Sequence, residues 1–159
     1  MIKIEDDFLD KDHLKKIQNT IFDLEFPWRI RQGTTPDKKD IYFTYCFFNY
    51  YLQQSDFFNS LIIPILEKLG ANALIQARSN MFLSDLFTKS GFHIDYPFKC
   101  KTSILYLNSC NGGTDFKIKG KTKFVQSKEN RLVTFSNIEH RAITSTDSSA
   151  RFIINLNYF

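Results

Sequence analysis

Eight short segments of β-forming residues follow one another at close, even spacing in the second half of this chain. This pattern constrains the fold more than any other feature. Short strands in such a series are typical of a sandwich or a barrel. With eight of them, a jelly roll is the natural closure. The segments are Ala73–Phe82, Phe92–Asp95, Thr102–Leu107, Thr114–Ile118, Lys123–Val125, Arg131–Phe135, Arg141–Ile143 and Arg151–Tyr158.

The aromatic content favours the same fold class. The 159 residues include 17 phenylalanines and 7 tyrosines but only 6 glycines and 4 prolines. Flat rings and β-branched Ile pack well on pleated surfaces, so a core lined by Phe is expected. The length fits one domain. We therefore predict an α+β, mainly β domain over residues 1–159, with a helical support region (1–70) and a jelly-roll catalytic core (71–159).

The first 70 residues carry the helical signals. Asp10 is placed as an N-cap before a helix whose apolar residues recur three and four positions apart, which gives it one buried face. A second helical segment begins near Ser55 and ends at Gly70, a residue that commonly terminates helices. Pro64 lies inside this segment, so we expect a kink or a late start. These helices are predicted to buttress the jelly roll.

A strand and a polar loop separate the two helical segments. Ile41–Leu52 is dense in Phe and Tyr and is predicted to be a strand. Arg31–Asp40 contains Gly, Thr, Pro and Asp, which are typical of a loop. A plain surface loop is the simpler interpretation of this segment, and a mobile lid is the alternative.

Charge and cysteine content narrow the functional classes. A net charge of +4 is too small to indicate nucleic acid or a membrane as a strong partner. The lysine-rich residues 117–128 are predicted to form an exposed hairpin, with attraction of an acidic substrate as the alternative. Three cysteines without C-x-x-C spacing argue against a disulfide framework and for a reducing cytoplasm. The abundance of Lys, Asn, Ile and Phe is typical of AT-rich genomes, such as those of phages or marine bacteria.

Three residues of the β-rich half form a candidate metal site. His93 and Asp95 are two positions apart, which places their side chains on the same side of a strand, and His140 follows a later strand. Two imidazoles and one carboxylate are the ligand set that holds non-haem Fe(II) and leaves positions open. By itself an H-x-D also occurs by chance, and a structural histidine is the alternative. His13, in the first helix, is expected to face solvent.

Arg151 begins the last predicted strand, eleven residues after His140. An arginine that points into an aromatic and aliphatic interior is costly unless it meets an anion. Its planar fork is suited to gripping a carboxylate at two points. An outward-facing arginine or an internal salt bridge explains the residue equally well.

In combination, these residues and several ordered motifs resemble the 2-oxoglutarate- and Fe(II)-dependent oxygenases, in particular the prolyl-4-hydroxylase-like branch. The resemblance covers nearly the whole chain and implies a double-stranded β-helix, which is a cupin-like jelly roll. The motifs that carry it are Ile4–Leu9 before a helix, His93-x-Asp95, the Tyr106-Leu107-Asn108 strand, Gly112-Gly113, Asn130–Phe135 leading to His140, and Arg151.

This resemblance implies Fe(II) as the metal, 2-oxoglutarate and O2 as cosubstrates, and ascorbate as a stimulant. His93, Asp95 and His140 would hold the iron. Arg151 would pair with the C5 carboxylate of 2-oxoglutarate. Halogenating relatives lack the carboxylate ligand, so the presence of Asp95 implies oxygenation.

Three further residues are candidates for contact with 2-oxoglutarate. Tyr106 would donate its hydroxyl to the C5 carboxylate, although a core tyrosine satisfied elsewhere is the alternative. Thr102 shares the strand face of Tyr106, and Asn155 shares that of Arg151. Asn80, on the strand before the metal motif, is a further candidate for cosubstrate or substrate. For Asn155 and Asn80, ordinary polar packing is the simpler interpretation.

The implied reaction is hydroxylation of a C–H bond in a peptide or protein side chain, with release of succinate and CO2. Peptidyl-prolyl hydroxylases usually carry a tryptophan near the end of the last strand, where this chain has Asn157. That difference weakens proline as the substrate. The alternatives are the same chemistry on a small molecule or nucleobase, and a non-catalytic jelly-roll binding or structural protein.

Overall fold

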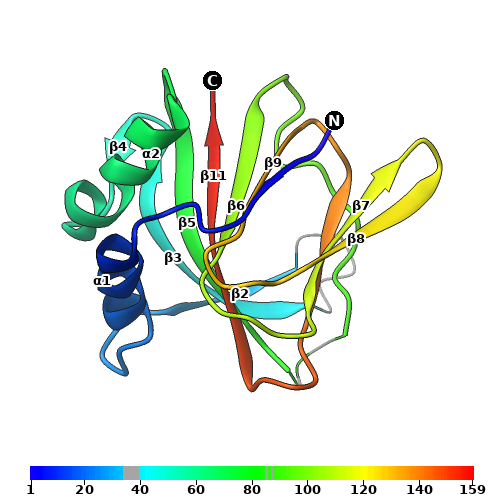
Figure 1. Cartoon of the computed structure of the whole chain (residues 1–159), viewed down its shortest axis with the longest axis horizontal. Helices are drawn as coiled ribbons and strands as arrows, with labels where there is room; N and C mark the ends of the chain where they lie inside the picture. Colours follow the sequence, from blue (N-terminus) through cyan, green and yellow to red (C-terminus); the bar gives the residue numbers. More distant parts are fainter. Residues whose placement is uncertain (34–39, 85, 87) are drawn as a thin grey trace.

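Two antiparallel β-sheets face each other, and the helices cover the outer face of the larger sheet (Figure 1). The computed structural model describes residues 1–33, 40–84, 86 and 88–159. In this part of the chain the larger sheet has the order β1-β9-β6-β11-β5-β3-β2, with β4 paired to β3, and the smaller has the order β10-β7-β8. The elements are β1 (Lys3–Glu5), α1 (Lys11–Ile21), β2 (Arg29–Gln32), β3 (Ile41–Asn49), β4 (Leu52–Gln53), a π-helix (Phe58–Ile62), α2 (Ile63–Leu69), β5 (Leu74–Leu83), β6 (Lys101–Tyr106), β7 (Gly113–Ile118), β8 (Lys121–Gln126), β9 (Leu132–Ser136), β10 (His140–Ile143) and β11 (Ala150–Tyr158).

From β5 onward the chain crosses repeatedly between the sheets. β5 and β6 belong to the larger sheet, β7 and β8 form the smaller one, β9 returns, β10 crosses again, and β11 inserts between β5 and β6. This winding is a double-stranded β-helix, which confirms the predicted fold class. The predicted strand Phe92–Asp95 is wrong: this segment only makes an isolated bridge, between His93 and His140, at the edge of the smaller sheet.

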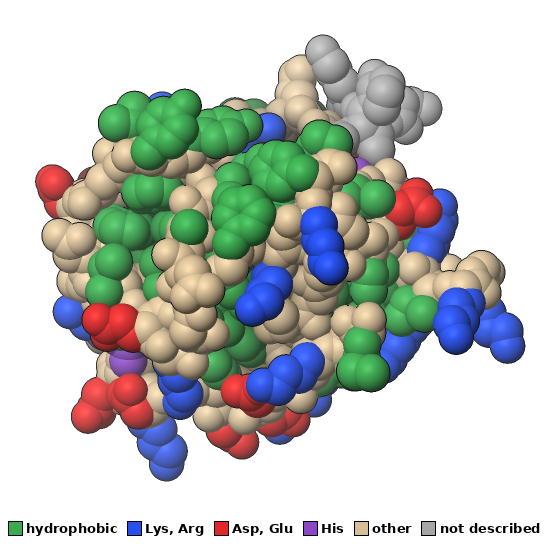
Figure 2. All heavy atoms as spheres, turned by 90° about the horizontal axis from the view of Figure 1, so that it is seen from above, with side chains coloured by type: hydrophobic (Ala, Val, Ile, Leu, Met, Phe, Trp, Pro, Cys, Tyr) green, Lys and Arg blue, Asp and Glu red, His purple; other side chains and the backbone are tan. Residues whose placement is uncertain are grey.

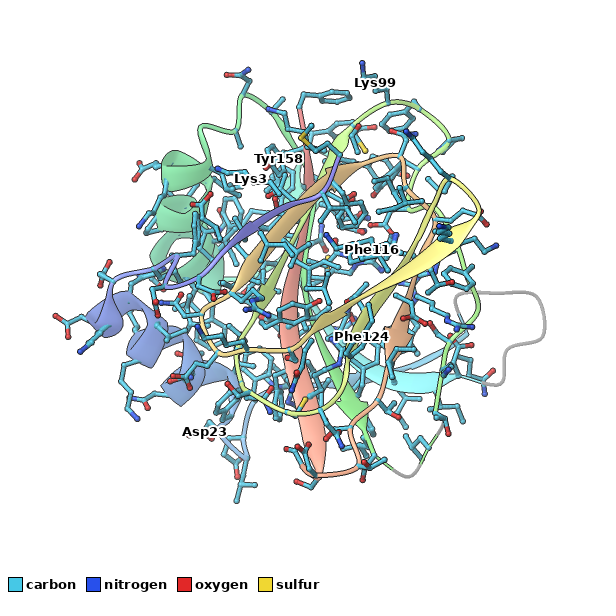
Figure 3. The ribbon with its side chains drawn as sticks, turned by 45° about the vertical axis from the view of Figure 1, so that its right-hand side comes forward. Lys3, Asp23, Lys99, Phe116, Phe124 and Tyr158 are labelled. Carbon is cyan, nitrogen blue, oxygen red and sulfur yellow. The ribbon has the colours of Figure 1, made fainter. Side chains whose placement is uncertain are left out.

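Strand β11 separates two hydrophobic cores. Ile154 and Leu156 belong to the core beneath the helices. Ile153 belongs to the core between the sheets, where it lies with Phe116 of β7 (Figure 3). Because side chains alternate along a strand, Arg151 and Asn155 face the same inter-sheet space as Ile153.

The N-terminal helices form as predicted. The Asp10 side chain accepts a hydrogen bond from the His13 amide at 2.8 Å, which caps α1. The second helical segment begins as a π-helix and becomes α-helical at Ile63, directly before Pro64, which confirms the late start. It ends at Gly70, whose φ of 61° is left-handed. The region 1–70 also supplies β1 to β4 to the larger sheet.

Two surface predictions have different outcomes. The lysine-rich segment is confirmed as a hairpin of β7 and β8, turned by Lys119 and Gly120, both with positive φ. In contrast, Arg31 and Gln32 were expected in a loop but belong to β2, an exposed strand at the edge of the larger sheet. Residues 34–39 of the predicted lid lie outside the described residues.

Cys46, Cys100 and Cys110 are all free. His13 does not face solvent as expected: it is half-buried, with Nε2 3.0 Å from the carbonyl oxygen of Leu61. Within the described chain, every helix is too short or too polar to cross a membrane.

Candidate metal centre

The backbone brings the two candidate histidines together at the edge of the smaller sheet. The His93 amide donates to the His140 carbonyl at 3.0 Å, and the His140 amide donates to the His93 carbonyl at 2.9 Å. This pair of bonds places the two imidazole centroids 4.6 Å apart. One local antiparallel contact therefore joins residues that are 47 positions apart in sequence.

Asp95 completes the cluster. Its Oδ1 lies 3.4 Å from Nε2 of His93 and 3.5 Å from Nε2 of His140. One ligand atom from each of the three residues lies within 4.8 Å of the others. Two donors that each sit about 2.1 Å from one ion are at most about 4.2 Å apart. The carboxylate and each imidazole are thus close enough to share a metal ion.

Hydrogen bonds on the far side of each ring fix its orientation. Nδ1 of His93 lies 3.2 Å from the Gly91 carbonyl oxygen, and Nδ1 of His140 lies 3.0 Å from the Ile138 carbonyl oxygen. A carbonyl oxygen can only accept, so each Nδ1 carries hydrogen. In the neutral ring the lone pair is then on Nε2, which faces Asp95. Backbone support of this kind is usual for metal-binding histidines.

Burial and mutual contact set the protonation of the three groups. Burial would raise the pKa of Asp95, but the hydrogen bond with His93 and the charges of His140 and His93 hold it well below its usual range. Burial would lower the pKa of His93, but its contact with Asp95 raises it. Burial lowers the pKa of His140. A carboxylate and two imidazoles are therefore available, and a metal ion would displace a proton from His93.

Arg151 lies deep in the space between the sheets. Its side chain is 0% exposed, and in the part of the chain that the structure describes no hydrogen-bond partner reaches Nε, Nη1 or Nη2. The guanidinium carbon is 4.6 Å from the ring centroid of Phe82 and 5.9 Å from that of Tyr106. Burial lowers the pKa of Arg151. An unpaired buried charge costs several kcal/mol of folding free energy. An anionic ligand that paired with Arg151 could recover about this amount.

A cavity of 240 Å³ joins Arg151 to the histidines. Among the residues proposed from sequence, it is lined by His93, Asp95, His140, Arg151, Asn155 and Asn80. The donor set and the orphaned guanidinium therefore open onto one space. This arrangement fits a metal ion together with a small anion that reaches from the ion to the arginine.

Tyr106 and Thr102 lie beside this cavity and do not line it. The Tyr106 hydroxyl donates to Oγ1 of Thr114 at 2.8 Å, and Thr114 does line the cavity. Of these two hydrogen-bonded residues, Thr114 on β7 is thus the one that lines the cavity. Sequence reasoning missed Thr114 because its neighbour on β6 is eight residues away, across a turn.

Thr102 and Asn155 belong to a hydrogen-bond chain behind Asp95. Asn155 Nδ2 lies 3.4 Å from Oδ2 of Asp95, Asn157 Nδ2 donates to Oδ1 of Asn155 at 2.9 Å, and the Thr102 hydroxyl donates to Oδ1 of Asn157 at 2.8 Å. The chain orients the carboxylate from β11 and β6. In this structure Thr102 contacts an amide and is three hydrogen bonds away from the candidate ligand Asp95.

Several cavity residues were not singled out from sequence. Arg78 of β5 and Arg31 of β2 bring two further cations, and the buried Asp40 brings a carboxylate. An arginine in an alternating strand is normally taken as solvent-facing, so the sequence carried no distinctive signal for Arg78.

Comparison with known proteins finds similar solved structures, but no protein-family model and no curated protein sequence matches the chain. Among solved structures, an oxidoreductase of the 2OG-Fe(II) oxygenase family from Burkholderia pseudomallei is similar with a TM-score of 0.78 and 12% identity, over 99% of this chain and 84% of that one.

Two further structures show the range of the fold. A prolyl hydroxylase from Trichoplax adhaerens, in complex with a hypoxia inducible factor oxygen degradation domain peptide fragment, has a TM-score of 0.71 and 14% identity, over 99% of this chain and 83% of that one. The non-heme alpha ketoglutarate dependent carbocyclase SnoK from nogalamycin biosynthesis has a TM-score of 0.70 and 11% identity, over 99% and 78%.

The chain therefore has the double-stranded β-helix fold that 2-oxoglutarate/Fe(II) oxygenases have, with a His-Asp-His cluster that is compatible with iron in its interior. Prolyl hydroxylases are among the structures with this fold that it resembles.

Proposed function

We propose that this chain is an Fe(II)- and 2-oxoglutarate-dependent dioxygenase that hydroxylates a C–H bond. The observation that carries the proposal is the shared cavity, which has a complete metal donor set beside a fully buried arginine without a hydrogen-bond partner among the described residues. The balanced reaction converts substrate C–H, O2 and 2-oxoglutarate into substrate C–OH, succinate and CO2. One oxygen atom enters the substrate and the other enters succinate.

Each part of the cavity has a role in this reaction. His93, Asp95 and His140 would hold Fe(II), which supplies the activation of O2 when it is bound. Arg151 would grip the C5 carboxylate of 2-oxoglutarate through charge-assisted hydrogen bonds. The apolar ring of Phe82 packs against that guanidinium and would keep water away from the ion pair. The protein thus supplies position and a dry environment.

Thr114 is expected to bind the cosubstrate more directly than Tyr106. Because Thr114 lines the cavity, its hydroxyl is expected to contact the cosubstrate, and Thr114→Val should weaken 2-oxoglutarate affinity about tenfold, the scale of one hydrogen bond to a charged group. Tyr106→Phe removes the hydroxyl behind it, so it should cost about 1 kcal/mol of unfolding free energy and change affinity less. Titration of both variants with 2-oxoglutarate checks the order. A larger effect in the tyrosine variant would indicate direct contact of Tyr106 with the carboxylate.

A peptide or protein is the substrate that the outer surface favours. Aromatic side chains run from the half-buried Tyr96, directly after Asp95, over the exposed Phe98 to the exposed Phe159, with ring centroids 5.1 Å and 6.0 Å apart. Tyr50 packs edge-on against Tyr96, and Tyr51 is 88% exposed. Figure 2 shows hydrophobic side chains gathered on this end of the molecule. Such a surface can support an extended chain next to the metal centre.

A small-molecule substrate is the second candidate. The cavity of 240 Å³ is small for a drug-sized ligand and must also hold the cosubstrate, so little of the substrate can enter it. A compact molecule fits this space as well as a single side chain does.

An anaerobic titration tests the reaction class. Addition of 2-oxoglutarate to the Fe(II)-loaded protein should produce a metal-to-ligand charge-transfer band, and admission of O2 should then yield succinate. A protein that shows neither the band nor succinate would be a non-catalytic jelly roll, and the proposal would be wrong.

A further inference from the structure

Arg78 occupies the middle of β5, and its side chain lines the same cavity as the metal cluster. β5 is paired on both sides, with Cys46 of β3 and Asn155 of β11 opposite Arg78. A residue at the centre of a sheet cannot turn its side chain round the sheet edge into water. The guanidinium is therefore held at the cavity, where it is only half-buried.

Arg78 forms no direct ion pair with a carboxylate among the described residues, although its charge helps to lower the pKa of the nearby Asp95. The other half-buried arginines differ: Arg131 contacts Asp6 at 2.6 Å, and Arg141 contacts Asp115 at 2.9 Å. A partly desolvated cation at a cavity wall that has no direct ion pair can bind an anionic ligand. In this respect Arg78 resembles Arg151.

The strand register separates the two arginines. Arg151 lies opposite Phe82, whereas Arg78 lies opposite Asn155, four residues further along β11. At about 3.3 Å per residue the two positions are about 13 Å apart. Asn155 also contacts the metal-ligand candidate Asp95. Arg78 therefore lies level with the metal cluster, and Arg151 lies four residues further along the sheet in the buried interior, so a diacid anchored at Arg151 leaves Arg78 for a different anion.

The solvent exposure of the side chains increases from Arg151 towards Arg78. Arg151 is fully buried, Arg78 is half-buried, and Phe159 at the end of β11 is 50% exposed within the aromatic surface described above. Arg151 thus lies at a closed part of the cavity wall, whereas Arg78 lies where the wall is partly open to solvent and a bound substrate can reach it.

The charge balance of the loaded cavity also favours a further anion. A bound Fe(II), a doubly charged 2-oxoglutarate, Asp95 and Arg151 together carry no net charge. Of the remaining charged groups that line the described cavity, Arg31 and Arg78 are cations and Asp40 is the one anion. The loaded site would keep one positive charge.

We propose that Arg78 forms a second anion subsite that binds a carboxylate of the substrate, so that the hydroxylated molecule is an acid. This inference rests on the proposed oxygenase function, since it assigns the other anion site to the cosubstrate. A carboxylate is favoured because the guanidinium fork matches its two oxygens. It belongs either to a small carboxylic acid or to an acidic side chain of a peptide.

Matched acids and amides test the subsite without turnover. The protein is loaded with Zn(II), with and without 2-oxoglutarate, and ligand-detected NMR measures binding of two probe sets. One set holds acetate to hexanoate and benzoate with their primary amides. The other holds acetyl-Gly-Asp-Gly-amide and acetyl-Gly-Glu-Gly-amide with their Asn and Gln counterparts. The wild type should bind at least one acid tenfold more tightly than its amide, and the set that shows this preference identifies the source of the carboxylate.

Three variants make the test specific. Arg78→Gln should abolish the preference and leave 2-oxoglutarate affinity unchanged, Arg78→Lys should keep part of the preference, and Arg29→Gln, on the exposed face of β2, should behave as the wild type. Thermal melting verifies that each variant is folded. Equal binding of acids and amides by the wild type, or a preference that survives in Arg78→Gln, would overturn the proposal. If the wild type fails to bind 2-oxoglutarate, the oxygenase function is wrong, and the acid preference of the Zn(II) protein alone still decides whether Arg78 is an anion site.

Discussion

Asp95→Asn is expected to lower the affinity for Fe(II) by more than about 100-fold and to reduce succinate formation by at least as much. The change preserves the volume of the side chain and removes the one carboxylate of the donor set, whose Oδ1 faces both Nε2 atoms. Loss of a partner that merely orients a ligand already costs about 10- to 100-fold in metal affinity, so loss of the ligand charge itself should cost more. Competition with a metal chelator measures the affinity, and succinate release measures the activity.

Asp115→Asn is the matched control. Asp115 is a buried aspartate of the smaller sheet, but it forms an ion pair with Arg141 at 2.9 Å and stands outside the His-Asp-His cluster. Loss of this pair should lower the unfolding free energy and leave Fe(II) affinity unchanged. If the two variants lose metal affinity equally, the effect of Asp95→Asn is a general consequence of destabilisation.

Arg151→Met should separate binding from stability, because the two quantities are expected to move in opposite directions. The loss of a buried charge pair with the cosubstrate costs about 2–5 kcal/mol, so 2-oxoglutarate affinity should fall by at least about 30-fold. In the metal-free protein the same charge has no hydrogen-bond partner among the described residues. Its replacement by an apolar chain of similar length should therefore maintain or raise the free energy of unfolding.

Two titrations and one unfolding curve check this prediction. Fe(II) affinity should persist, since Arg151 is outside the donor set. A fall in the unfolding free energy of the metal-free variant would show that the guanidinium has a structural partner in solution. Unchanged affinity for 2-oxoglutarate would remove Arg151 from the cosubstrate site.

Much of the fold could be predicted because strand and helix periodicity are local. The alternation along β11 and the capping of α1 by Asp10 are visible in a few consecutive residues. Phe92–Asp95 was wrongly predicted as a strand because its composition suits one, whereas its pairing is limited to one bridge. β2 was missed at Arg31 and Gln32 because all four residues of this edge strand are exposed, so no buried face marks it.

The candidate site was less visible in the sequence than the fold. The metal cluster follows from an H-x-D motif and one later histidine, and the backbone contact that joins them spans 47 residues. The direction of a hydroxyl or a guanidinium depends on neighbours from other strands. Tyr106 donates to Thr114, Thr102 donates to Asn157, and Arg78 faces the cavity, and none of these contacts has a signature in the sequence.

The division of β11 between two cores has a consequence for how this protein can evolve. Ile154 and Leu156 meet the helical layer, while Arg151 and Asn155 meet the cavity, so adjacent codons are subject to unrelated selective pressures. Substitutions on the cavity side can change which molecules bind without loosening the helical layer. On the face of β11 that packs against the helices, substitutions are tolerated as long as the new residue is apolar and of suitable volume. Such independence helps to explain how chains with only 11–14% identity retain one architecture while they accumulate different reactions.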